Sequence, residues 1–300
     1  MSVTAAEPAR LARLARSWLS ALGLQMTVVV LLQAGFALAI ARHLGPLSPA
    51  RAVSTLLLFV PESIARRLIN DYDDYRRGVD RLDNARPGSA LALGLPMHQV
   101  RIVGLACFAI AVAWVGYLLY TTTPASIVIL PLMCVTLIYS GGPSPLGYRG
   151  LGEVVDFVLT GFLVVGGVIW VNVHRLGLPV VLGALAAGFL FAITMLHNDL
   201  RDIEEDRRAG KQTVAHLLSA GAAKAWYAGL IIAPYACIAL LAWQFHSVRY
   251  AAPLLTFPYA AWLLIGVLRS RLGATMPPWL PHLPRLLTSF FAIFVLAAWI

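Results

Sequence analysis

Two groups of acidic side chains in this sequence have similar internal spacing and could act on one ligand together. Each group begins with an Asn-Asp pair, has another aspartate three residues after that pair, and a further one shortly beyond. The members are Asn70, Asp71, Asp74 and Asp80 in one group and Asn198, Asp199, Asp202 and Asp206 in the other. Because helical residues three and four apart share a face, the leading members of each group are expected to line up. Carboxylates stacked in this way repel one another, which indicates a compensating cation.

Hard carboxylate oxygens at this density suit Mg²⁺, which typically binds one or two carboxylates together with substrate phosphates and water. The sequence therefore predicts Mg²⁺ held between the protein and a diphosphate. One alternative is that the acids only pair with neighbouring arginines on a solvated face, and another is that they are the carboxylates of a transporter or proton relay. The predicted metal ligands are Asp71, Asp74, Asp80, Asp199, Asp202 and Asp206.

Basic side chains next to both groups could stabilise the charge of a departing diphosphate. Lys211, which follows Ala209-Gly210, is best placed for a phosphate contact. We therefore expect Asp74, Asp202 and Lys211 to be the catalytic residues. Arginines beside a membrane can equally be topology anchors. The arginines predicted to contact substrate next to the two groups are Arg76, Arg77, Arg207 and Arg208.

The composition is that of a membrane protein rather than a soluble domain. Hydrophobic residues make up 59% of the chain and charged residues 12%, with a mean hydropathy of +0.77. A soluble domain of 300 residues could not bury this much apolar surface. The net charge of +9 does not indicate a nucleic acid partner, because the basic residues border apolar segments and are placed to hold anionic headgroups or phosphates.

Apolar runs of about 20 residues are long enough to cross the roughly 30 Å hydrocarbon layer as helices. The sequence predicts an all-α polytopic membrane protein with about nine such helices, the first of them retained rather than cleaved as a signal peptide. They are expected near 17–41, 51–72, 98–120, 124–140, 152–173, 178–199, 219–243, 250–268 and 284–300.

The basic residues predict the orientation of these helices. With the N-terminus in the cytoplasm, only Arg42, Arg51, Arg175 and Arg249 of the 23 Lys and Arg residues fall outside. Both acidic groups then end even-numbered helices and face the cytoplasm. We expect residues 1–300 to form a single transmembrane domain in the cell membrane, with a possible pseudo-repeat of four-helix units whose motifs lie at 70–80 and 198–211.

The two acidic groups resemble the paired aspartate motifs of the UbiA superfamily of intramembrane prenyltransferases. The second match continues from Asn198 to Lys211. The resemblance implies a nine-helix bundle around a central cavity, with Mg²⁺ and a prenyl diphosphate held between the motifs at the cytoplasmic side. It also implies that the cavity opens sideways to the lipid bilayer, which would take up the isoprenoid tail.

Within that superfamily, the stretch 139–153 resembles the fourth loop of 1,4-dihydroxy-2-naphthoate prenyltransferases, as does the six-residue step from Asp74 to Asp80. Arg149 in this loop is a candidate contact for an acceptor carboxylate or for the diphosphate. Asp156 is a candidate acceptor-binding or acid/base group, or a buried partner for an arginine. The remaining residues predicted to contact substrate are Asn70, Tyr139, Tyr148, Arg149 and Asn198.

The function implied is Mg²⁺-dependent transfer of a prenyl group from a prenyl diphosphate to an aromatic acceptor, 1,4-dihydroxy-2-naphthoate in menaquinone biosynthesis. A membrane terpene cyclase of the same superfamily, or a prenyltransferase with another aromatic acceptor, is the alternative. An ion transporter is a third hypothesis from a different class. Transport predicts ion flux without diphosphate release, whereas both enzymes predict Mg²⁺-dependent diphosphate release.

Overall fold

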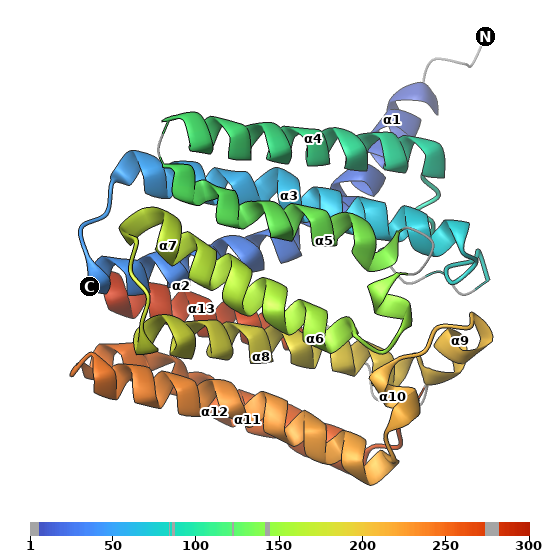
Figure 1. The fold of residues 1–300 in the computed structure, drawn as a ribbon. Helices are drawn as coiled ribbons and strands as arrows, with labels where there is room; N and C mark the ends of the chain where they lie inside the picture. The colour runs from blue at the N-terminus through green and yellow to red at the C-terminus, as the bar shows by residue number, and fades with distance from the viewer. Residues whose placement is uncertain (1–5, 84, 86–87, 122, 142–144, 274–281) are drawn as a thin grey trace.

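The computed structural model describes residues 6–83, 85, 88–121, 123–141, 145–273 and 282–300, and these residues form a bundle of helices (Figure 1). Besides helices, the described residues contain one isolated bridge, between Arg149 and Gln212. The helices are α1 (Ala6–Ala21), α2 (Leu24–Leu44), α3 (Pro49–Arg76), α4 (Met97–Thr121), η1 (Pro124–Ile129), α5 (Leu130–Ser140), η2 (Leu146–Tyr148), α6 (Gly152–Asp156), η3 (Phe157–Gly166), α7 (Gly167–Val173), α8 (Leu178–Arg201), α9 (Ile203–Arg208), α10 (Val214–Leu217), α11 (Ala220–Gln244), η4 (Val248–Thr256), α12 (Phe257–Arg269) and α13 (His282–Trp299).

Seven helical segments are long and apolar enough to cross a membrane, which confirms an all-α, multi-pass membrane protein. Two further expected spans do not meet that measure. One is α3, which carries Glu62, Arg66 and Arg67, and the other is the short η1–α5 segment. The count of nine therefore stays a prediction. The seven segments are 10–44, 97–121, 152–173, 178–201, 220–244, 248–269 and 282–299.

The first predicted helix is wrong at its start. The structure has two helices there, because α1 ends at Ala21 and α2 begins at Leu24. Gly23 between them has a φ of 64°, in the left-handed region that glycine adopts without steric cost. The side chain of Arg67 fills the space beside this glycine, where an added Cβ would overlap Cδ of Arg67. The apolar run alone gave no sign of this break.

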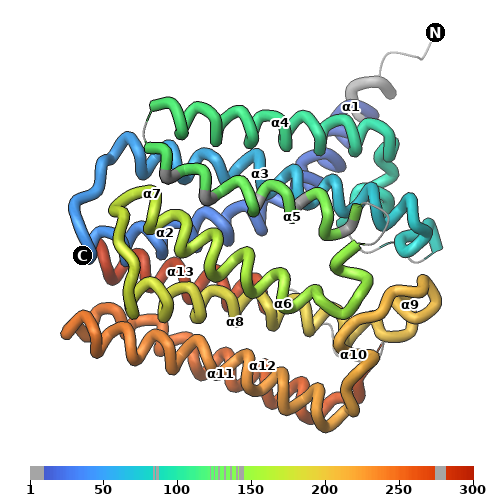
Figure 2. The backbone as a smooth tube through the Cα atoms, in the orientation of Figure 1, coloured from blue at the N-terminus to red at the C-terminus, as the bar shows by residue number. Residues whose placement is uncertain are grey.

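The long helices run side by side and place both acidic groups at the same end of the bundle (Figure 2). Helix α3 packs against α2 and α4, and α8 packs against η3 and α11. The core between α2 and α13 is aromatic, with the rings of Phe36 and Phe294 4.4 Å apart. The ends of α3 and α8 lie with α9 and α10 at one end, and the C-terminus lies at the other.

Local sequence signals position the two helices that carry the acidic groups. Helix α3 begins with Pro49 after Ser48, whose side chain accepts a hydrogen bond from the backbone N–H of Arg51. It continues for 28 residues, so Asp71 and Asp74 lie in its last two turns. Helix α8 begins at Leu178, with Pro179 in its first turn, and ends at Arg201. Each acidic group therefore starts inside a long helix; the first continues into the loop after α3, and the second continues into the short helix α9.

Candidate active site

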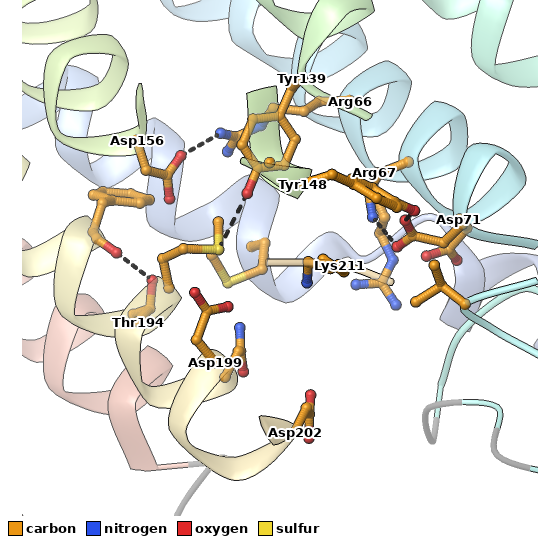
Figure 3. A pocket seen from close by; sticks show the side chains of 18 of the residues that line it. Arg66, Arg67, Asp71, Tyr139, Tyr148, Asp156, Thr194, Asp199, Asp202 and Lys211 are labelled. Atoms are coloured by element: carbon orange, nitrogen blue, oxygen red, sulfur yellow. Dashed lines mark hydrogen bonds and ion pairs between the residues drawn. The ribbon is translucent and has the colours of Figure 1, made fainter. Parts of the chain in front are cut away.

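The two acidic groups meet at one cavity of about 290 Å³, although they are far apart in the sequence. Figure 3 shows members of both groups directed toward the same space, with Lys211 between them. Tyr139, near the end of α5, and Tyr148, in η2, complete the polar wall. The predicted site residues that line the cavity are Asn70, Asp71, Asp74, Asp80, Tyr139, Tyr148, Asn198, Asp199, Asp202, Asp206 and Lys211.

The carboxylate of Asp74 is held by donors on both oxygens. Nδ2 of Asn70, one turn earlier on α3, donates to Oδ2 over 2.9 Å, and the hydroxyl of Tyr148 donates to Oδ1 over 2.9 Å. Burial and the nearby Asp74 carboxylate raise the pKa of Tyr148, so its hydroxyl remains a donor. Asp71 anchors the loop between α3 and α4, since its Oδ2 accepts a hydrogen bond from the backbone N–H of Ala90 over 2.9 Å.

The carboxylates of the second group differ in their partners. Asp202 lies between α8 and α9, and both of its oxygens accept from the guanidinium of its neighbour Arg201. Asp199 and Asp206 are each 4% exposed. Nζ of Lys211 lies 3.2 Å from Oδ2 of Asp206. Each oxygen of Asp202 keeps a second lone pair for another ligand, because the Arg201 contact uses one on each oxygen.

Lys211 carries the positive charge that faces these carboxylates. Burial disfavours its ammonium form, but Asp206, Asp199 and Asp74 together outweigh that effect and raise the pKa of Lys211 above its usual value. The ammonium group therefore stays protonated across the neutral pH range. Its side chain is 22% exposed, toward the cavity that it lines. A charged lysine there can contact a phosphate that enters the cavity.

The donor set fits Mg²⁺ that is bound together with a phosphate ligand. Within the described ranges, no group of three or more His, Cys, Asp or Glu side chains is close enough to hold a metal without other ligands. Mg²⁺ needs no such cage, because it commonly takes one or two carboxylates and completes its shell with phosphate oxygens and water. Asp74 and Asp202, one from each acidic group, both line the cavity and are the residues predicted to provide the hard oxygen donors of such a site.

The loop between α5 and α6 is tied to the loop that carries Lys211. The backbone N–H of Gly150 donates to the carbonyl of Gln212 over 2.7 Å, and Gln212 N–H donates to the carbonyl of Tyr148 over 3.3 Å. These two bonds place Tyr148 beside Asp74 while Lys211 reaches the same cavity. Residues 142–144 of the predicted loop motif lie outside the described residues.

The predicted arginine contacts do not line the cavity. All five are exposed at the end of the bundle that carries the site. The guanidinium of Arg77 lies over the ring of Tyr148, 5.3 Å from its centroid, and Arg207 pairs with Glu204 over 2.8 Å. Their contact with substrate stays a prediction. The five predicted arginine contacts are Arg76, Arg77, Arg149, Arg207 and Arg208.

Two arginines that were not among the predicted site residues do line the cavity. Nη1 of Arg66 lies 3.3 Å from Oδ1 of Asp156, so Asp156 has an arginine partner. Arg67 donates from Nε to the carbonyl of Ala21 over 2.9 Å and from Nη2 to that of Gly88 over 2.8 Å. Charged residues inside a spanning helix are the sequence signal that could have identified both.

The protein resembles known prenyltransferases in sequence and fold. The model of the UbiA prenyltransferase family matches residues 28–280. The 1,4-dihydroxy-2-naphthoate octaprenyltransferase of Haemophilus influenzae is 29% identical over 68% of this chain and 69% of that protein. The enzyme of the same name from Escherichia coli is 29% identical over 71% of this chain and 73% of that protein.

A solved structure of a UbiA homologue from Archaeoglobus fulgidus, bound to GPP and Mg²⁺, has the same fold. It aligns with a TM-score of 0.64 at 18% identity and covers 95% of this chain and 100% of that one. The resemblance inferred from the paired aspartate motifs is thereby confirmed, as is the expectation of a prenyltransferase. The chain belongs to the UbiA prenyltransferase family.

Proposed function

We propose that this protein transfers a prenyl group from a prenyl diphosphate to 1,4-dihydroxy-2-naphthoate and that the reaction depends on Mg²⁺. The observation that carries the proposal is that both acidic groups and Lys211 line one cavity. The names of the Haemophilus influenzae and Escherichia coli relatives support the acceptor, and the GPP and Mg²⁺ bound to the Archaeoglobus fulgidus homologue support the donor and the metal.

The two acidic groups would bind the diphosphate through the metal. Asp74 and Asp202 are the proposed principal ligands, with Asp71, Asp80, Asp199 and Asp206 around them. Mg²⁺ held there would supply positive charge to offset the charge that develops on the leaving diphosphate. Lys211 donates hydrogen bonds to the same phosphates and stabilises that charge further.

Bond breakage and bond formation then involve different parts of the cavity. The C–O bond of the prenyl diphosphate breaks, and its electron pair leaves with the diphosphate. A ring carbon of the acceptor forms the new carbon–carbon bond and releases its proton, and the carboxyl group of a naphthoate acceptor leaves as CO₂ with a proton taking its place. The faces of Tyr139 and Tyr148 can stabilise the allylic cation. The apolar lining that shields the cation from water includes Met26, Val30, Leu159 and Phe191.

We further propose that the chain lies in the cell membrane with its N-terminus and its active site in the cytoplasm. The basic residues support this orientation, because most of them fall at the end of the bundle where the acidic groups lie. A cytoplasmic site would receive a water-soluble hydroxylated acid directly. The apolar chain of the donor would enter from the bilayer.

The experiment that tests the function combines purified protein with Mg²⁺, prenyl diphosphates of graded length and a panel of hydroxylated aromatic acids. Products are identified by mass. The proposal predicts prenylated, decarboxylated naphthalenediol and equimolar diphosphate. Cyclised hydrocarbon without an aromatic product would instead indicate a terpene cyclase. Ion flux in liposomes without diphosphate release would indicate a transporter.

A further inference from the structure

Arg66 and Asp156 form an ion pair on the cavity wall that diphosphate binding, as proposed above, does not use. Nη1 of Arg66 donates to Oδ1 of Asp156 over 3.3 Å, and 27% and 11% of the two side chains remain exposed. Both residues line the cavity, and Figure 3 shows the pair beside Tyr139. Placing two charged side chains inside the bundle costs desolvation free energy. A charged pair on the cavity wall that diphosphate binding does not use therefore calls for another function.

The Arg66 guanidinium has hydrogen-bonding capacity to spare. It carries five N–H donors, and within the described part of the chain its bond to Asp156 is the only hydrogen bond of its side chain. Oδ2 of Asp156 likewise receives no hydrogen bond from the described residues. Glu62 is buried outside the cavity lining and is near enough to attract Arg66 electrostatically. The ion pair therefore leaves N–H donors of Arg66 and the Oδ2 acceptor of Asp156 available to a ligand.

The backbone next to Asp156 departs from regular α-helix. Asp156 ends α6, and the following ten residues, Phe157–Gly166, form the π-helix η3. Oγ1 of Thr160 donates to the carbonyl of Asp156 over 2.6 Å, and Gln33 donates to the carbonyl of Thr160. Because π turns are rare and occur frequently at functional sites, this is an independent indication that the position of Asp156 matters for function.

The pair lies deeper in the bundle than the proposed metal ligands. Arg66 precedes Asp74 by two turns of α3, about 12 Å along the helix axis. A diphosphate held at Asp74 and Lys211 would direct its carbon chain toward this region. A ring that reacts at the first carbon of that chain would therefore have its polar edge near Arg66. The Asp156 carboxylate can accept a hydrogen bond from a ring hydroxyl, a donor that a diphosphate lacks, so the pair suits the acceptor rather than the donor.

We propose that Arg66 and Asp156 determine acceptor specificity by recognising an aromatic ring that carries a carboxylate next to a hydroxyl. Arg66 binds the carboxylate through neighbouring N–H groups, and Asp156 accepts the hydrogen bond of the adjacent hydroxyl. This inference rests on the proposed function, since 1,4-dihydroxy-2-naphthoate has such an edge. It assigns the acceptor carboxylate to Arg66 rather than to Arg149, which is exposed outside the cavity lining.

Stable fluorescent probes test this assignment without turnover. The probes are 1-hydroxy-2-naphthoate and 1-naphthol, which lacks the carboxylate, and each is titrated into the purified full chain in detergent. Arg66→Gln should weaken binding of 1-hydroxy-2-naphthoate about tenfold or more, since a hydrogen bond to a charged group is lost. Binding of 1-naphthol should change by less than about twofold, since its hydroxyl meets Asp156. Arg66→Lys keeps the charge but not the paired N–H donors of the guanidinium, so it should weaken binding of 1-hydroxy-2-naphthoate by an intermediate amount. This variant provides the test if Arg66→Gln does not fold.

The matched control is Arg51→Gln on the same helix. Arg51 donates to the carbonyls of Val171 and Asn172 and does not line the cavity, so both probes should bind this variant as they bind the wild type. Equal weakening of both probes by the Arg66 variants, or unchanged binding of 1-hydroxy-2-naphthoate, overturns the inference. Failure of the proposed function looks different, because the wild type itself would then give no prenylated naphthalenediol.

Discussion

The hydroxyl of Tyr148 lies 2.9 Å from Oδ1 of Asp74 and joins the loop between α5 and α6 to the first acidic group. Asn70 holds the other oxygen of the same carboxylate. Asp74 is therefore oriented from two directions before any ligand arrives. Such preorganisation matters for a metal ligand, because reorienting the carboxylate on metal binding would cost free energy and weaken the affinity for the metal.

Tyr148→Phe should lower the Mg²⁺-dependent affinity for prenyl diphosphate while leaving the fold intact. The loss of one hydrogen bond to a charged group is worth about 1.5–3 kcal/mol, so the apparent affinity should fall about ten- to hundredfold. Steady-state kinetics with varied prenyl diphosphate measure the change. Tyr235→Phe is the control, since its hydroxyl bonds to Thr256 within the helix bundle and away from the cavity lining. Equal effects of the two substitutions would argue against a special role for the Tyr148 hydroxyl.

Lys211→Gln should raise the KM for prenyl diphosphate much more than the KM for the acceptor. The charged ammonium group faces the phosphates, and the loss of such a contact corresponds to about ten- to hundredfold in affinity. Lys224→Gln is the matched control, because Lys224 is the other lysine of the chain and its Nζ donates to the carbonyls of Leu268 and Ser270. Parallel increases in both KM values for Lys211→Gln would contradict phosphate binding by this residue.

Gly23→Ala should destabilise the protein and disturb Arg67. A left-handed conformation costs a non-glycine residue roughly 1–2 kcal/mol, and the new Cβ would overlap the Arg67 side chain. The thermal midpoint in detergent should fall. Gly229→Ala is the control, because an added Cβ there meets nothing within 4 Å. An unchanged midpoint for Gly23→Ala would show that the α1–α2 junction adapts without cost.

The sequence allowed much of the fold and site to be predicted, because the dominant signals are local. Apolar runs located the long helices, and helical spacing within the acidic groups located their shared faces. The parity of the helices predicted that Asp74 and Asp202 would lie at one end of the bundle, and both line the cavity. A single break such as Gly23 depends on a distant side chain, Arg67, and no local pattern reveals it.

Side-chain partners across the bundle could not be predicted for the same reason. Arg66 and Asp156 are 90 residues apart, and only the folded bundle brings their side chains together on one cavity wall. Arg149 and Arg207 are near the motifs in sequence but do not line the cavity, so their contact with substrate stays a prediction.

The claim that Asp74 and Asp202 jointly hold magnesium diphosphate is tested most directly by equilibrium binding of geranyl diphosphate to the purified protein with and without Mg²⁺. Wild type and the control Asp83→Asn, which alters an exposed acid paired only weakly with Arg81, should bind in a Mg²⁺-dependent manner. Asp74→Asn and Asp202→Asn should each lose that binding while remaining folded. Binding that is equal without Mg²⁺, or retained in both cavity variants, would contradict the claim.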